Sequence, residues 1–158
     1  MRSVWYKEAK LLRTFIIKIQ PGEDLVEKLA ATVREIGIDH AVVTSAVGSV
    51  TDVKFRGIKA GAKLPITVPR MTVHQIEGPL ELLGLNGNFF PDASGRTDCH
   101  LHIQMSKSSG EVIGGHLFSA KVFASCEIMI SELHTEGIER HYSKTGGTAT
   151  IFIEEEHE

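Results

Sequence analysis

The stretch Cys99-His-Leu-His-Ile-Gln-Met105 is the most informative part of this sequence. Apolar and polar residues alternate along it with a period of two, which is typical of a half-buried β-strand. Its odd-numbered residues are expected to face the core, and His100, His102 and Gln104 then lie together on the opposite face. Two imidazoles that are two residues apart on one strand face can converge on a single metal ion.

A second strand, Val112-Ile-Gly-Gly-His-Leu-Phe118, follows the turn-forming residues Lys107-Ser-Ser-Gly110. A hairpin centred on Ser109 places His102 directly opposite His116. The Cβ atoms of such a pair lie about 4.5–5.5 Å apart. A register slip of one residue would turn His116 to the other face, so the predicted cluster depends on this register.

Three histidines, His100, His102 and His116, with a vacant fourth position match a catalytic type of zinc site better than a closed structural one. Neutral imidazole also suits nickel, copper or iron, so another divalent metal is an alternative. Gln104 lies on the right face to support a ligand. Glu127, a lone carboxylate in an apolar stretch, is the candidate acid/base or outer-shell group. The competing interpretation is a solvated polar face of the sheet that binds no metal.

Other possible sites are weaker. Gly114-Gly115 precedes His116 and is expected to leave open space beside the site. The stretch Ser45-Ala-Val-Gly-Ser49 is expected to be a tight turn, with a pocket lined by its backbone as the alternative. Gly84-Leu-Asn-Gly-Asn88 is glycine-rich but lacks the strand-to-helix context of a phosphate loop, so no organic cofactor is expected. The remaining histidines do not cluster and are expected at the surface or an interface: His40, His74, His134, His141 and His157.

One convincing helix is predicted over Leu25–Ile36. Asp24 stands at its N-cap with Glu27 three residues later, and Gly37 is a suitable C-cap. The other expected strands cover 11–19, 41–46, 50–58, 72–77, 80–90, 122–133 and 148–153, with loops at 59–69 and 91–98 and an irregular stretch at 135–147. This order predicts an α+β fold, a mainly antiparallel sheet or open barrel with one principal helix packed on it.

The bulk composition narrows the classes of function. A chain of 158 residues fits one domain, here 1–158. Its net charge of -3 and acidic C-terminus argue against an autonomous DNA binder, which usually carries a basic patch or tail. No apolar run is long enough to span a membrane, and no signal peptide is evident, so the cytoplasm is the expected location. Cys99 and Cys126 are then expected to be reduced core thiols.

Four segments in combination resemble the PPC (plants and prokaryotes conserved) domain family, over roughly Phe15 to Leu133. They are Gly78-Pro-Leu-Glu-Leu-Leu-Gly-Leu-Asn-Gly-Asn88, His100-Leu-His-Ile103, Gly114-Gly-His-Leu117 and Ser125-Cys-Glu-Ile128. The resemblance implies a homotrimer that binds a divalent metal, often zinc, through histidines that map onto His100, His102 and His116. It also implies a fold similar to that of acetolactate decarboxylase, a zinc enzyme.

Members of this family carry a DNA-binding label. In the plant proteins that label rests on an Arg-Gly-Arg-Pro-type AT-hook, which this sequence lacks. Three functions are therefore expected to compete. The first is a stand-alone metal-binding homotrimer that handles a small molecule, either as a sensor or as a metal-dependent lyase or hydrolase that acts on a small carbonyl compound. The second is a DNA-binding, regulatory role by resemblance, in which the metal is structural or regulatory. The third is an oligomerisation module.

Overall fold

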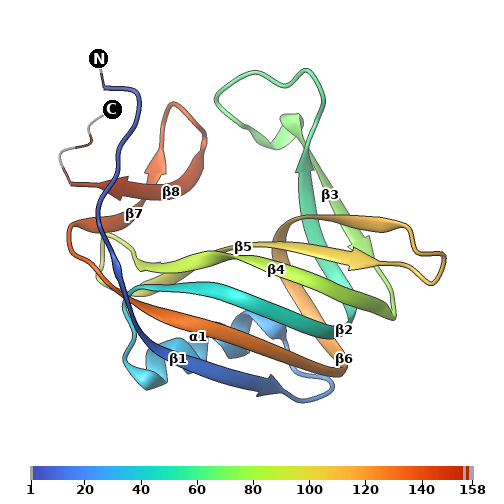
Figure 1. Ribbon diagram of the computed structural model, residues 1–158. Coiled ribbons are helices and arrows are strands. Elements are labelled where there is room, and N and C mark those ends of the chain that lie inside the picture. Colours follow the sequence, from blue (N-terminus) through green and yellow to red (C-terminus); the bar gives the residue numbers. More distant parts are fainter. Residues whose placement is uncertain (1, 155, 157–158) are drawn as a thin grey trace.

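The computed structural model describes residues 2–154 and 156, and shows a strongly curved antiparallel sheet with one helix and a separate hairpin (Figure 1). In chain order the elements are β1 (Lys10–Ile19), α1 (Leu25–Ile36), β2 (Ala41–Ile58), the 3₁₀ turn η1 (Val68–Arg70), β3 (Met71–Ile76), β4 (Leu80–Pro91), β5 (Thr97–Ser106), β6 (Val112–His134), β7 (Ile138–Ser143) and β8 (Thr148–Ile153).

The main sheet closes on itself into a partial ring. Its strand order is β1-β6-β5-β4-β2-β3, and β2 also pairs with β6, so β6, β5, β4 and β2 form a closed circuit of hydrogen-bonded neighbours. All of these pairings are antiparallel. The predicted α+β class, a mainly antiparallel sheet or open barrel with one principal helix, is confirmed.

The helix α1 has the predicted bounds because both of its ends are capped. The Asp24 side chain accepts a hydrogen bond from the backbone N–H of Glu27 at 2.9 Å, and Gly37 takes the left-handed conformation (φ 79°) that favours glycine. The buried face, which includes Leu25 and Leu29, packs against β5 and β6. At 12 residues α1 is the longest helix among the described residues, and it is too short to cross a bilayer.

The alternation along β5 is confirmed by burial. Leu101, Ile103 and Met105 are at most 2% exposed, and they belong to a single apolar core. Burying side chains of this size stabilises a fold by about 1.5–3 kcal/mol each. The even-numbered residues of β5 are thereby fixed on the opposite face, which carries the histidines.

The sequence predicted a break within each of two strands that the structure shows to be continuous. The stretch Ser45-Ala-Val-Gly-Ser49 lies inside β2 and is not a turn, and β6 continues through the predicted break at 119–121. The β2–β6 register shifts at several points, including one between Gly48 and Val50. Such bulges bend a strand without ending it, so the residues typical of a turn here produce curvature.

The segment 135–147 was expected to be irregular, which is wrong. It contains β7, which pairs with β8 as a separate two-stranded sheet, so β8 does not belong to the main sheet. This β7–β8 hairpin meets the loop 59–69, because the backbone N–H of Ile66 donates to the carbonyl of Gly146 at 2.8 Å. The loop and the hairpin together border one side of the site described next.

Candidate metal centre

The histidine cluster is built by the β5–β6 hairpin. A tight turn holds the hairpin: the N–H of Lys107 donates to the carbonyl of Glu111 at 2.9 Å, and the N–H of Gly110 donates to that of Lys107 at 2.8 Å. The resulting register pairs His102 with His116, as the turn residues predicted. His116 therefore faces the same side of the sheet as the histidines of β5.

The three imidazoles face one another closely enough to share one ion. One ring nitrogen from each of His100, His102 and His116 lies within 4.8 Å of the other two. The Nε2 atoms of His100 and His102 are 3.2 Å apart. His102 is exposed, and the other two are half-buried, so a ligand can enter from solvent while the ring positions are set by packing.

The distance between the nitrogens of His100 and His102 fits the donor geometry of a divalent ion. A tetrahedral zinc with Zn–N bonds of about 2.0–2.1 Å holds its ligand nitrogens about 3.3 Å apart. The separation of 3.2 Å between the Nε2 atoms of His100 and His102 is close to that value. Three imidazoles also leave at least one coordination position for water or a substrate. The residues present therefore fit a divalent metal.

The surroundings of His100 and His116 favour neutral imidazole, which is the form that binds metal. Burial and the nearby charge of Arg56 lower the pKa of His116 to about 4. Burial, together with His102, Arg140 and Arg56, lowers the pKa of His100, and Asp98 opposes this shift. Protons therefore do not compete with a metal for His116 near neutral pH.

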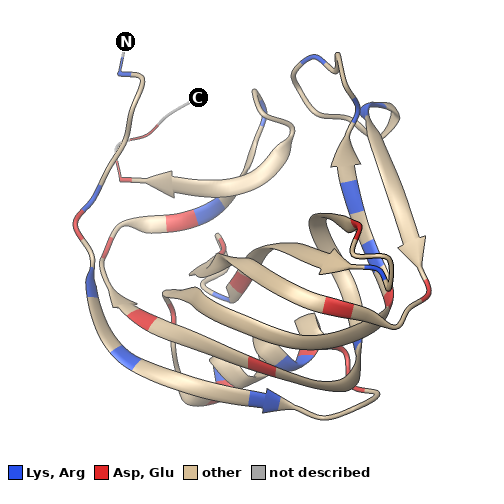
Figure 2. Ribbon diagram, turned by 45° about the vertical axis from the view of Figure 1, so that its right-hand side comes forward, with Lys and Arg blue, Asp and Glu red and all other residues tan. Residues whose placement is uncertain are grey.

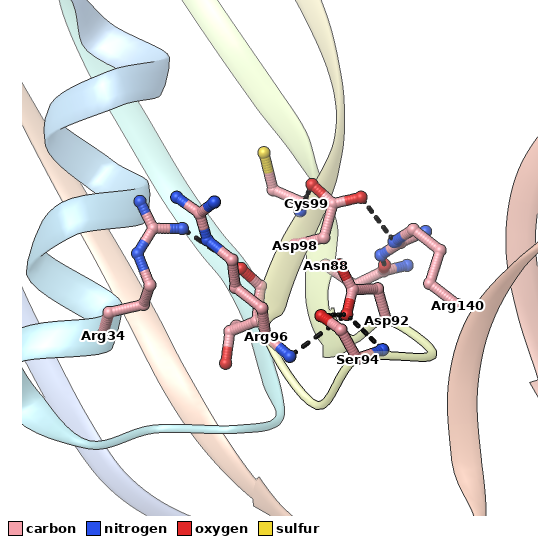
Figure 3. Close-up of polar contacts among 9 residues, drawn as sticks. Arg34, Asn88, Asp92, Ser94, Arg96, Asp98, Cys99 and Arg140 are labelled. Carbon is pink, nitrogen blue, oxygen red and sulfur yellow. Dashed lines mark hydrogen bonds and ion pairs between the residues drawn. The ribbon is translucent and has the colours of Figure 1, made fainter.

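Two arginines beside the cluster were not predicted. Arg56 lies opposite His116 in the β2–β6 ladder, and its Nη2 donates to Thr148 Oγ1 at 3.2 Å. Arg140, on β7, lies beside Asn88 and Asp98 (Figure 3). Its side chain is 3% exposed, and its Nη2 donates to Asn88 Oδ1 at 2.6 Å.

Asn88 connects Arg140 to the cluster, because it pairs with His100 across the β4–β5 ladder. The Nε of Arg140 lies 3.7 Å from Asp98 Oδ2, which is a weak ion pair and leaves that N–H without a hydrogen-bond partner. The alternation Ile138-Glu-Arg140 could have indicated that Arg140 is buried, since it places the arginine on the same strand face as a buried isoleucine.

The two glycines before His116 have a different role from the one expected. A Cβ on Gly114 would collide with the backbone carbonyl of Ile103, and a Cβ on Gly115 with that of Arg56. Glycine is required there because the neighbouring strands approach closely. Gly115 also lines a cavity beside the histidines, so the expected open space exists beside Gly115, whereas Gly114 does not line that cavity.

The other predicted residues lie elsewhere. Glu127 is exposed, eleven residues further along β6 than His116 and opposite Lys18 of β1, so it does not join the histidine cluster. Gln104 lines a second cavity with His100 and His102 and accepts a hydrogen bond from Asn86 at 3.3 Å.

The remaining histidines with described positions are separate from the cluster. His40 contacts Phe90, His74 stacks on Phe55, His141 pairs with Glu139, and His134 is exposed at the end of β6. His157 lies outside the described residues. Both cysteines are free thiols, and burial raises the pKa of Cys99 and of Cys126 to about 11.

Solved structures share this fold. A plant- and prokaryote-conserved (PPC) protein of Pyrococcus horikoshii is 26% identical, with a TM-score of 0.79, and the match covers 98% of this chain and 99% of that one. A protein of Archaeoglobus fulgidus described as metal-containing is 30% identical, with a TM-score of 0.81 and coverage of 94% and 99%.

Curated relatives are longer proteins. AT-hook motif nuclear-localized protein 24 of Arabidopsis thaliana is 34% identical over 110 residues, which are 68% of this chain and 31% of that protein. The bifunctional protein GlmU of a Synechococcus strain is 26% identical over 144 residues, which are 90% of this chain and 20% of that protein. The chain thus spans less than a third of either relative.

The model of one family, the Plants and Prokaryotes Conserved (PCC) domain, matches residues 6–134. That range contains all three histidines, Arg56 and the whole main sheet, and it confirms the resemblance that the sequence motifs carried. With most of its length matched, the chain belongs to the plants and prokaryotes conserved domain family, abbreviated PPC or PCC.

Proposed function

We propose that His100, His102 and His116 bind a divalent metal ion, and that this metal centre is the functional site of the protein. The observation that carries the proposal is the approach of three imidazole nitrogens within 4.8 Å of one another. The metal-containing relative from Archaeoglobus fulgidus supports it. Metal analysis of the wild type beside His102→Ala tests it.

Zinc is the proposed metal. Three neutral nitrogen donors with an open position are the ligand set of many catalytic zinc sites. Nickel, copper and iron accept the same donors, so they stay alternatives that rank below zinc. Loss of metal in a His102 variant is expected whichever of these ions the protein carries.

An open metal position next to a cavity also supports catalysis. A bound ion can polarise the carbonyl of a small substrate or lower the pKa of a bound water. We therefore keep a metal-dependent lyase or hydrolase that acts on a small carbonyl compound as the alternative function. Glu127 is too far along β6 to be the first choice of proton carrier, so any such group is sought in the ligand or in the bound water.

We further propose that the protein assembles as a homotrimer through the outer face of β1 and β6. Ile16 is 79% exposed and lies opposite Met129, which is 37% exposed, so two large apolar side chains are neighbours on that face. Leu12, also on β1, is 52% exposed. Exposed apolar residues that adjoin one another mark interaction surfaces, and a second copy of the same chain would cover them.

A DNA-binding, regulatory role is the second candidate, supported by the name of the plant relative. Against it, Lys and Arg segments are spread over the ribbon and interleaved with Asp and Glu, as Figure 2 shows. Titration with duplex DNA at low and at high salt tests the DNA-binding role, because phosphate contacts weaken steeply as the salt concentration increases. Salt-sensitive binding at micromolar protein would support the role, and its absence would contradict it.

We propose, finally, that residues 1–158 act as one domain in a reducing compartment such as the cytoplasm. One continuous apolar core supports the single domain, and two free thiols fit a reducing environment. A single cooperative unfolding transition, the same by fluorescence and by circular dichroism, is the expected result for one domain.

A further inference from the structure

A cavity of about 310 Å³ adjoins the histidine cluster and reaches residues from several elements. The histidines form one wall of it. The other walls combine one cation, one hydroxyl and apolar groups. Its lining comprises Arg56, Gly57, Ile58, Ile66, His100, His102, Gly115, His116 and Thr148. A volume at the lower end of the usual range for ligand sites suits a small molecule.

Arg56 is the residue of this cavity whose hydrogen bonding is incomplete. Its Nε is buried and has no hydrogen-bond partner. Its Nη1 contacts the sulfur of Met71, a weak acceptor, and its Nη2 donates to Thr148 at 3.2 Å. Among the described residues no carboxylate forms an ion pair with it. A half-buried guanidinium without a counter-charge is costly, and an anion beside it would reduce that cost.

A bound metal would increase the same imbalance. Three neutral imidazoles leave a divalent ion with both of its positive charges, and Arg56 adds a third next to it. The carboxylate of Asp98 raises the pKa of His100, but it is paired with Arg140 (Figure 3) and does not line this cavity. The cavity on the Arg56 side therefore has a strongly positive wall with no protein anion to compensate for it.

We propose that this cavity binds a small organic acid, with its carboxylate on Arg56 and the oxygen on the adjacent carbon directed to the metal. This inference rests on the proposed metal site and names the class of ligand for it. A guanidinium matches a carboxylate because its N–H groups form parallel hydrogen bonds to the two oxygens. Ile58 and Ile66 offer an apolar surface to a short aliphatic chain. The best ligands are thus 2-hydroxy or 2-oxo acids of a few carbons.

A phosphate is a poorer match for these walls. Phosphate sites in proteins usually combine several backbone N–H groups or a helix N-terminus with the cation. Here the lining is mainly strand residues with apolar or imidazole side chains, and Arg56 is its single cation. Inorganic phosphate is therefore the control anion, and it is expected to bind more weakly than the organic acid.

The experiment is calorimetric titration of the zinc-loaded protein with 2-hydroxybutanoate, with butane-1,2-diol as the uncharged analogue and inorganic phosphate as the control anion. The wild type is expected to bind the acid more tightly than the diol or phosphate. Arg56→Gln is expected to weaken binding of the acid about tenfold or more, which is the effect of losing a charge-assisted hydrogen bond. Arg56→Lys keeps the charge but lacks the planar guanidinium. Its affinity for the acid is expected to lie between those of the wild type and Arg56→Gln.

Arg96→Gln is the matched control, because Arg96 is exposed in the turn after β4 and does not line the cavity. Metal content is measured on every variant by mass spectrometry. If the wild type holds zinc and both Arg56 variants bind the acid as well as it does, the anion subsite is wrong and the metal site stands. Equal binding of the acid and the diol by the wild type, or tighter binding of phosphate, overturns the subsite without relying on any variant. A wild type without metal contradicts the proposed function itself.

Discussion

His102 and His116 lie directly opposite each other across the β5–β6 ladder, with ring centroids 5.5 Å apart. His100 joins them from the same face of β5, with centroids 5.0 Å and 5.1 Å from the other two rings. Side chains on one face of an antiparallel pair are held by the backbone ladder, so the cluster exists before a metal arrives. The protein is therefore expected to gain stability when metal binds, without a large change of fold.

Acid is expected to destabilise the metal-free protein through His116. The pKa of His116 is lowered from 6.5 to about 4, so between these values the unfolded chain binds a proton there that the folded chain does not. Stability therefore falls as the pH decreases from about 6.5 to about 4. The check is the unfolding temperature of chelator-treated protein across this range, for the wild type and His116→Gln. The variant is expected to lose less stability, and an identical pH profile would contradict the assignment.

Gly115→Ala is expected to destabilise the protein by about 1–3 kcal/mol, the usual cost of overpacking. The added Cβ would meet the backbone carbonyl of Arg56 on the neighbouring strand, which cannot rotate away as a side chain can. Gly57→Ala is the matched control, because the space around Gly57 is open. Denaturant unfolding of both variants gives the comparison. Equal stability would show that the strands can separate at Gly115 without cost.

Ile16→Lys is expected to disrupt the proposed trimer, because it places a charge on the apolar face that Ile16 shares with Met129. Val68→Lys is the control, since Val68 and Ile16 are both 79% exposed and Val68 lies in the turn η1 before β3, away from that face. Light scattering after size exclusion reports the mass. A monomeric wild type would contradict the trimer, and an intact trimer in Ile16→Lys would contradict this choice of face.

The sequence was most informative where local chemistry determines structure. The turn around Ser109 fixed the register that joins His102 and His116, and the caps Asp24 and Gly37 fixed both ends of α1. It was least informative where curvature replaced a turn, as at Gly48 inside β2. Residues that favour turns also favour bulges, and only the pairing with a distant strand distinguishes the two outcomes.

The arginines show a second limit. An arginine in a sequence is usually solvated, so Arg140 gave no reason to expect a side chain that is 3% exposed. Its burial depends on the packing of β7 near β4, a contact between segments about fifty residues apart. The sequence likewise gave no reason to place Arg56 beside His116. That position follows from the long β2–β6 pairing, and the predicted breaks in both strands did not anticipate this pairing.

The most direct test of the central claim is the metal content per chain of untagged protein, measured by mass spectrometry after incubation with zinc and removal of the excess. His102→Ala is compared with His134→Ala, whose histidine is exposed at the end of β6, away from the cluster. The expected result is bound metal in the wild type and in His134→Ala, and its loss in His102→Ala. No metal in any of the three proteins, or equal metal in all of them, would contradict the account and leave the histidines as a polar face of the sheet.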